Sequence, residues 1–261
     1  MLKRAYLCYG LSLTELLIGI TIGTIVVSGA FYLLADSARY GVVNLRSAEL
    51  SQNLRATMAL IVADIRRAGY AAITDSSQVP WNPFLSGSYD IRTGNADGEA
   101  PNSCIVLSYN LDEDSPPHVD NYDASSGDNN EKFGFRLHQH AIETRTGIPD
   151  TDDAADCELG SWEDLTEADI EITDLTFNLN HTQVEILEDE ITNTGAFSGE
   201  TDDLCSAGNP CLCIRNVEVV LSGRVRSASM QEIEQTLSSS VRVRNDKYLT
   251  AFDPAKPCRD P

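Results

Sequence analysis

The chain has 261 residues and carries 40 acidic against 19 basic side chains, so its formal net charge at pH 7 is −21. A surface of this sign repels phosphate backbones and argues against direct binding of nucleic acid. The length allows one globular domain in addition to a terminal segment.

The first predicted element is an apolar helix at the N-terminus. The segment Leu11–Leu34 has no charged side chain except Glu15, and it is long enough to cross the roughly 30 Å hydrocarbon core of a membrane. Lys3 and Arg4 precede it without a nearby acid, which predicts a cytoplasmic N-terminus and export of the rest of the chain. An ionised carboxylate in such a segment needs a partner, so Glu15 is a candidate functional residue.

A glycine stands immediately before this segment, in the pattern Gly10-Leu11-Ser12-Leu13-Thr14-Glu15. The pattern resembles the prepilin-type leader of type IV pilins and type II secretion pseudopilins. The resemblance implies that a prepilin peptidase cuts between Gly10 and Leu11, methylates Leu11, and leaves the apolar helix on the mature chain. Most of that family has phenylalanine where Leu11 stands. The alternatives are a plain signal anchor and an ordinary secretory signal cut near Ser28-Gly29-Ala30.

Residues 35–70 predict that the helix continues as an amphipathic segment. Apolar side chains recur there at helical spacing, at Leu50, Leu54, Met58, Ile61, Ile65 and Ala68. We expect one continuous helix from Leu11 to about Ala68, and the alternative is two helices with a hinge near Gly41. The stripe should pack on the domain that follows.

Residues 71–261 predict a β-rich head domain. Short runs of β-branched and aromatic residues alternate with turn-forming residues, and the expected strands are Cys104–Asn110, Phe133–Gln139, Ile172–Asn180, Gln183–Leu187, Ile214–Arg226 and Thr236–Arg244. Period-two alternation in several of them is typical of half-buried antiparallel strands. The predicted fold class is therefore α+β: a long N-terminal helix, membrane-spanning in its first half and amphipathic in its second, packed on an antiparallel β-sheet head.

Of the seven cysteines, Cys8 lies in the predicted leader and six remain in the exported part, at Cys104, Cys157, Cys205, Cys211, Cys213 and Cys258. An even number in an oxidising compartment predicts up to three disulfides, whose pairing the sequence leaves open. One of them should close a small loop through Cys205. A metal cluster is the alternative, but the spacing lacks the C-x2-C pattern typical of zinc sites.

Acidic loops between the strands offer weak candidates for calcium, which prefers oxygen ligands. The candidate ligands are Asn95, Asp97, Glu99, Asp123 and Asp128. Neither the group around Asp97 nor the group around Asp123 and Asp128 has the spacing of an EF-hand loop. Solvated acidic loops without a cofactor are therefore the simpler interpretation. His138 and His140 would lie on one face of a strand as a possible pair of zinc ligands, although a third ligand is not evident.

Later segments resemble PilW-like minor pilins. Ala63-Asp64-Ile65-Arg66-Arg67-Ala68-Gly69-Tyr70 is similar to the end of that family's long helix, and the strands near residues 102–109, 214–224 and 240–245 are similar to its core strands. The resemblance implies a pilin-like fold and a minor pilin that takes part in type IV pilus assembly, in a priming or tip complex. Implied partners are other minor and major pilins, the prepilin peptidase, the inner-membrane assembly platform and the membrane. The implied location is the inner membrane with a periplasmic head, and then the pilus surface.

Two other functions stay open at this stage. A type II secretion pseudopilin of the GspJ kind shares the leader and a β-rich head. A membrane-anchored calcium-dependent adhesin or enzyme is the other, although no nucleophile-base pairing, phosphate loop or H-E-x-x-H motif is present. We therefore expect no enzymatic activity.

Overall fold

The structure is a computed structural model of the whole chain, and it describes residues 12–72, 82–112, 131–149, 153–185, 205–225, 232–255 and 258. Helix α1 covers Leu13–Arg67 as one element of 55 residues and passes through Gly41 without a break. The expected continuous helix is confirmed, and the alternative with a hinge near Gly41 is wrong. By contacts, the chain divides into two compact units, Met1–Ala48 and Glu49–Pro261.

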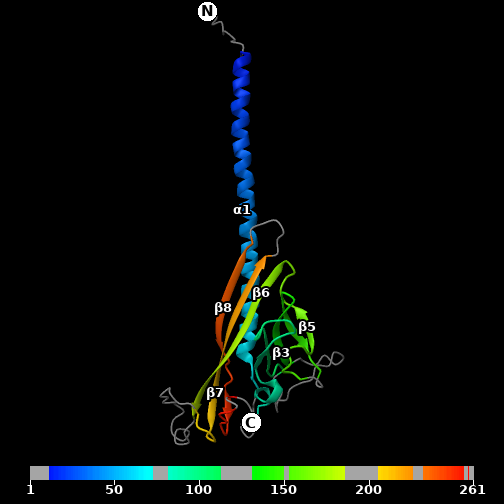
Figure 1. Cartoon of the computed structure of the whole chain (residues 1–261), viewed down its shortest axis with the longest axis vertical. Helices are drawn as coiled ribbons and strands as arrows, with labels where there is room; N and C mark the ends of the chain where they lie inside the picture. Colours follow the sequence, from blue (N-terminus) through cyan, green and yellow to red (C-terminus); the bar gives the residue numbers. More distant parts are fainter. Residues whose placement is uncertain are drawn as a thin grey trace, which may run out of the picture. The chain divides into compact units, whose positions relative to one another are not determined.

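The head contains two antiparallel sheets, shown in Figure 1. The first sheet has the order β1-β2-β3-β4-β5, with bounds β1 Arg92–Gly94, β2 Cys104–Ser108, β3 Lys132–His138, β4 Ala141–Gly147 and β5 Ser161–Asp164. Two short 3-10 helices, η2 Pro83–Leu85 and η3 Gly87–Tyr89, precede it.

The second sheet has the order β6-β7-β8, and β9 also pairs with β7. Its strands are β6 Ile170–Glu185, β7 Cys211–Val225, β8 Glu234–Arg242 and β9 Lys247–Leu249. The strands expected over Ile172–Asn180 and Gln183–Leu187 are one strand as far as Glu185, because β6 pairs with β7 through the intervening His181 and Thr182. Polar residues there do not end the strand, since β7 supplies backbone partners throughout. Ile186 and Leu187 lie outside the described residues.

The predicted helical stripe forms one side of the main core. Leu50, Leu54, Ile61 and Ile65 are fully buried and pack with side chains of both sheets, including Phe135, Ile172, Val219 and Leu221. Figure 1 shows β6, β7 and β8 running beside this C-terminal part of α1. The stripe is buried because its four-three spacing keeps apolar side chains on one helix face.

Strand β2 is buried along its whole length because each of its two faces packs into a different apolar cluster. Ile105 and Leu107 join the main core. Cys104 and Val106 point to the opposite face, where they pack with Cys157 and Trp162. A helix packed on sheets of antiparallel strands makes this an α+β fold with the pilin-like layout that the sequence predicts.

Candidate functional site

The first candidate site is the start of α1. Ser12 is the last residue before the helix, and its Oγ accepts a hydrogen bond from the backbone N–H of Glu15 at 3.2 Å. In return, Glu15 Oε2 accepts a hydrogen bond from the backbone N–H of Ser12 at 3.0 Å. This reciprocal pair is a capping box, which satisfies two backbone donors that a helix N-terminus otherwise leaves free.

The capping box gives Glu15 a role that our sequence analysis missed. The signal was present, because serine followed three residues later by glutamate is the capping-box pattern. The predicted processing residues Gly10 and Leu11 lie outside the described residues.

The first part of α1 presents its apolar side chains without cover. Large side chains from Leu13 to Leu34 are exposed by more than half, among them Leu13 at 76%, Ile25 at 71% and Phe31 at 68%. By length and composition this is one helix that could cross a membrane, and its most apolar window has no buried residue. Such a surface is stable only when lipid or other apolar helices surround it.

The hydroxyl groups in this apolar stretch are hydrogen-bonded within the helix. Thr21 Oγ1 donates to the Ile18 carbonyl at 2.9 Å, and Thr24 Oγ1 donates to the Thr21 carbonyl at 2.9 Å. Ser28 Oγ likewise donates to the Thr24 carbonyl at 2.7 Å. Because these donors are already satisfied, they do not add the cost of unpaired polar groups in an apolar environment.

The second candidate feature is the set of three disulfides in the head. Cys104 pairs with Cys157, Cys205 with Cys211, and Cys213 with Cys258. This fits the expected framework, including the small loop closed through Cys205. The last two disulfides pack with Leu249 and Phe252 in a separate apolar cluster next to β9.

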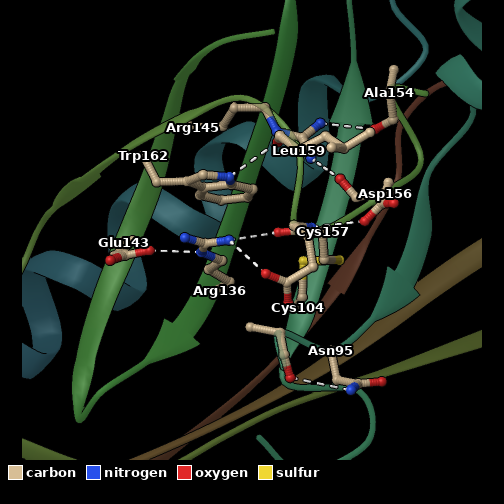
Figure 2. Close-up of a disulfide and its surroundings, with 12 residues drawn as sticks. Asn95, Cys104, Arg136, Glu143, Arg145, Ala154, Asp156, Cys157, Leu159 and Trp162 are labelled. Carbon is tan, nitrogen blue, oxygen red and sulfur yellow. Dashed lines mark hydrogen bonds and ion pairs between the residues drawn. A yellow bond between two sulfur atoms is a disulfide. The ribbon is translucent and has the colours of Figure 1, made fainter. Parts of the chain in front are cut away.

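Two buried arginines and a tryptophan surround the Cys104–Cys157 disulfide (Figure 2). The indole of Trp162 lies between two guanidinium groups, with Arg136 at 4.3 Å and Arg145 at 4.7 Å from the ring. Arg145 donates to the backbone carbonyls of Ala154, at 2.8 Å, and Asp156. Burial, and then the charge of Arg136, lower the pKa of Arg145 to about 10. The cluster holds the loop that contains Cys157 on the first sheet.

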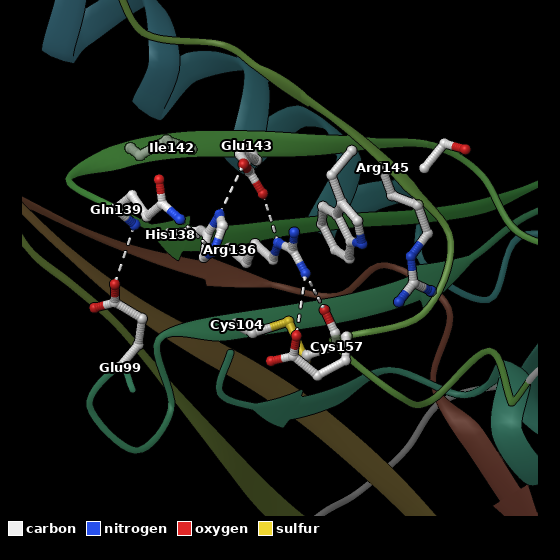
Figure 3. Close-up of polar contacts among 12 residues, drawn as sticks. Glu99, Cys104, Arg136, His138, Gln139, Ile142, Glu143, Arg145 and Cys157 are labelled. Carbon is white, nitrogen blue, oxygen red and sulfur yellow. Dashed lines mark hydrogen bonds and ion pairs between the residues drawn. A yellow bond between two sulfur atoms is a disulfide. The ribbon is translucent and has the colours of Figure 1, made fainter. Parts of the chain in front are cut away.

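Arg136 connects this disulfide loop to the β3–β4 hairpin, as Figure 3 shows. Its Nε donates to Glu143 Oε2 at 2.6 Å, and its Nη1 donates to the Cys157 carbonyl at 2.8 Å. The other oxygen of Glu143 lies 3.0 Å from His138 Nδ1. The carboxylate of Glu143 is therefore shared between a buried cation and an imidazole.

The two histidines do not lie on one strand face as our sequence analysis expected. Strand β3 ends at His138, and Gln139 and His140 form the hairpin turn with φ values of 50° and 67°. Positive φ at both central residues is typical of the turns that join antiparallel strands. The turn sends His140 towards Glu171, whose Oε1 lies 3.8 Å from its Nδ1.

The candidate calcium ligands that the structure describes take part in local contacts. Glu99 Oε1 accepts a hydrogen bond from the backbone N–H of Gln139 at 3.2 Å (Figure 3). Asn95 Nδ2 donates to the Ala96 carbonyl at 3.2 Å, and the backbone N–H of Asp97 donates to Glu158. Asp123 and Asp128 lie outside the described residues.

A different carboxylate group comes together around the second half of α1. Glu49, Glu167 and Asp169 can each offer an oxygen atom, and these atoms lie within 4.8 Å of one another. Sequence spacing gave no signal for it, because Glu49 is far along the chain from the other two. Acidic groups this close are common on surfaces without a bound ion, so we do not assign a metal centre.

A buried ion network links the two sheets and was also absent from our sequence analysis. Asp90 accepts hydrogen bonds from Arg215, which is 1% exposed, and from Lys247 Nζ at 2.9 Å. Arg215 Nη2 also donates to the Asn245 carbonyl at 2.5 Å. Asp90, Arg215 and Lys247 line a cavity of about 310 Å³.

The end of α1 is held by the C-terminal part of the head. Asn245 Nδ2 donates to the carbonyls of Arg67, at 3.2 Å, and Ala68, at 3.0 Å. The N–H of Gly69 donates to the Ser108 carbonyl of β2 at 2.8 Å. The two contacts from Asn245 satisfy carbonyl groups that a helix C-terminus leaves free.

An apolar helix without cover in its first half, whose second half packs on an antiparallel, disulfide-bonded head, defines a type IV pilin-like protein. The family model of prepilin peptidase-dependent protein B matches residues 43–243, and the chain belongs to that family. The match covers most of the amphipathic helix and most of the head, so it is independent of the leader motif. Neither a curated protein nor a solved structure matches the chain.

Membership gives the chain a pilin-like role in the assembly of a pilus or a secretion system. It also identifies the prepilin peptidase as a processing partner, which agrees with an N-terminal apolar helix suited to membrane anchoring.

Proposed function

We propose that this chain is a PilW-like minor pilin that takes part in type IV pilus assembly, as a subunit of a priming or tip complex. The observation that carries the proposal is the uncovered apolar first half of α1, which begins at the Ser12–Glu15 capping box. In the membrane, lipid covers this surface. In a filament, the corresponding helices of neighbouring subunits replace the lipid.

In this proposal the peptidase cuts after Gly10 and methylates Leu11, and the head is periplasmic before assembly and on the pilus surface afterwards. Mass spectrometry of the mature N-terminus tests the processing step. A chain that starts at methylated Leu11 is the expected result. An intact Met1 or a cut after Ala30 would contradict it.

Glu15 has two possible contributions to assembly, which the capping geometry allows us to separate. Its carboxylate caps the helix through the Ser12 N–H. It also carries a charge that, in an apolar filament core, would pair with the N-terminal amine of an adjacent subunit. We propose that the charge pairing drives assembly and that capping only fixes the position of the carboxylate.

Three substitutions distinguish these contributions. Glu15→Gln keeps an acceptor for the Ser12 N–H and removes the charge, and Glu15→Ala removes both. Ser12→Ala removes the reciprocal bond to the Glu15 N–H, with a cost of about 1 kcal/mol, and keeps the charge. Each variant is expressed in a strain that lacks the native gene, and pili are counted by electron microscopy and by shearing.

We expect both Glu15 variants to be processed and inserted into the membrane but to reduce piliation, and Ser12→Ala to assemble. Normal piliation by Glu15→Gln would show that charge is not required. Membrane fractions probed with an antibody against the head verify that each variant is present.

A secretion pseudopilin is the other role that the family allows. Deletion of the gene distinguishes the pilin role from the pseudopilin role. Loss of pili with intact secretion supports the proposed pilin role. Intact pili with lost secretion would instead support a secretion pseudopilin. In either system we propose a structural role without catalysis.

A further inference from the structure

One edge of the second sheet is hydrogen-bonded to other parts of the head, whereas at the other edge no further strand pairs within the described part of the chain. Strand β6 forms one edge, where the N–H of Ile172 donates to the His140 carbonyl and the N–H of Phe177 donates to the Asn102 carbonyl, both at 2.8 Å. Strand β8 forms the other edge, and within the described part of the chain it pairs only with β7.

The hydrogen bonds at its two ends show which β8 residues face outward. Val225 N–H donates to the Ile233 carbonyl, and Val243 N–H donates to the Arg215 carbonyl. In an antiparallel pair, bonded and non-bonded positions alternate, and the register from Arg224↔Glu234 to Asn216↔Arg242 has no bulge. The odd-numbered residues of β8 therefore form backbone hydrogen bonds with β7. The even-numbered residues of β8 direct their N–H and C=O groups away from β7.

The outward-facing positions have charged side chains, which usually protect an edge strand, only at the two ends of the row. They are Glu234, Thr236, Ser238, Ser240 and Arg242, all with exposed side chains. The strand contains no proline, no lysine and no bulge between these positions. An edge of this kind is a template for an added strand.

Positive charge gathers at the C-terminal end of this edge. Arg66 at the end of α1, together with Arg242 and Arg244, lines a groove of about 480 Å³ beside Ser240 and Val241. Arg242 binds Asp246 at 2.7 Å. Among the residues that the structure describes, no hydrogen-bond or ion-pair partner is found for the side chains of Arg66 and Arg244. In a chain of net charge −21, two exposed guanidinium groups without a carboxylate form a local site for acidic residues.

We propose that the outer edge of β8 and the arginine groove together bind an extended acidic segment of a neighbouring subunit, which adds to the second sheet as an antiparallel strand. Its backbone pairs with the even-numbered positions, and its acidic residues lie at its beginning, opposite Arg66 and Arg244. On the face beside Leu237, which packs against the main core, the added strand carries apolar side chains. The neighbouring subunit as the source rests on the proposed function, whereas the binding edge does not.

The test uses the purified full chain in detergent and a short peptide with alternating threonine and valine that begins with two glutamates. Fluorescence anisotropy of the labelled peptide measures binding, and a peptide that begins with two lysines is the control probe. We expect the glutamate peptide to bind and the lysine peptide to bind at least about tenfold more weakly, since it places like charges together.

Two kinds of substitution test the two parts of the site. Ser238→Pro removes an outward N–H while leaving the bonds of Leu237 and Ser239 to β7, and it should weaken binding at least about tenfold. Arg66→Ser and Arg244→Ser should each weaken binding about two- to fivefold, as exposed ion pairs do. Arg55→Ser is the matched control, since Arg55 is an exposed arginine of α1 about 16 Å along the helix from Arg66.

Absence of peptide binding, or binding that Ser238→Pro and the two arginine variants leave unchanged, would overturn the proposal. Circular dichroism verifies that Ser238→Pro is folded, and the arginine variants keep the test valid if it is not. A chain that binds the peptide but forms no pili would refute the proposed function and leave this edge site intact.

Discussion

Arg215 donates a hydrogen bond to Asp90 across a sequence separation of 125 residues, in the buried interior of the head. Asp90 follows η3, and Arg215 belongs to β7, so this contact joins the first sheet's leading segment to the second sheet. Lys247 in β9 binds the other oxygen of the same carboxylate. One buried acid therefore compensates two buried cations.

Asp90→Ala should destabilise the head by about 3–5 kcal/mol, because it leaves Arg215 and Lys247 as buried charges without their shared carboxylate. Chemical denaturation of the full chain in detergent measures the change. Glu163→Ala, at an exposed position of β5, is the control and should stay within about 0.5 kcal/mol. A loss at Asp90 no larger than that of the control would contradict the prediction.

Trp162→Ala should cost about 2–4 kcal/mol, because it removes the ring that lies between the Arg136 and Arg145 guanidinium groups. Trp162→Phe keeps an aromatic face and should cost less than half as much. Thermal unfolding under non-reducing conditions measures both. Equal losses for the two variants would show that an aromatic face does not account for the stabilisation, and would assign it to the indole N–H, which donates to the Leu159 carbonyl at 3.1 Å.

Tyr109 should ionise only at high pH. Burial, and then the charge of Asp64, raise its pKa to about 12, and its ring stacks on Phe133 with centroids 4.1 Å apart. Because the folded state holds this proton more tightly than the unfolded state, the stabilisation is present below about pH 10 and is lost as the pH rises through about 12. Ultraviolet absorbance of phenolate follows the titration.

Tyr109→Phe should remove the late step from that titration, and Asp64→Asn should move it to lower pH. The exposed Tyr248 serves as the control. A late step that persists in Tyr109→Phe would assign it to another residue.

The three disulfides should differ in their contribution to stability. Cys104–Cys157 closes a loop with a sequence separation of 53, whereas Cys205–Cys211 has a separation of 6. Loop entropy predicts about 4 kcal/mol for the first and about 2 kcal/mol for the second. Each disulfide is removed by replacing both of its cysteines with serine, which leaves no free thiol. Chemical denaturation then measures the loss of stability. A larger loss for Cys205–Cys211 than for Cys104–Cys157 would contradict the prediction.

Much of the fold could be predicted because its patterns are local. The helical stripe from Leu50 to Ala68 is buried as its spacing indicates, and β2, β3, β7 and β8 lie within a few residues of the expected strands. The missed strands β1, β5 and β9 are three or four residues long, too short for a periodic signal. Strand β4 was missed because its sequence, AIETRTG, contains only one large apolar residue, and its partners β3 and β5 hold it in the sheet.

The contacts of the candidate site were harder to predict from the sequence, because they join distant parts of the chain. No spacing rule connects Asp90 to Arg215 or brings Trp162 between two arginines. The Ser12–Glu15 capping box was the exception, since both members lie within one helical turn.

The cap of α1 has a consequence for the order of folding. The carbonyls of Arg67 and Ala68 receive their hydrogen bonds from Asn245, at sequence separations of 178 and 177 residues. Contacts this distant carry a large loop-closure cost and form late. During synthesis the helix and the first sheet therefore emerge well before the residue that completes the helix end. Until then, the apolar stripe of α1 lacks the side chains of β7 and β8 that cover it in the folded head, and apolar surface exposed in this way is prone to aggregation.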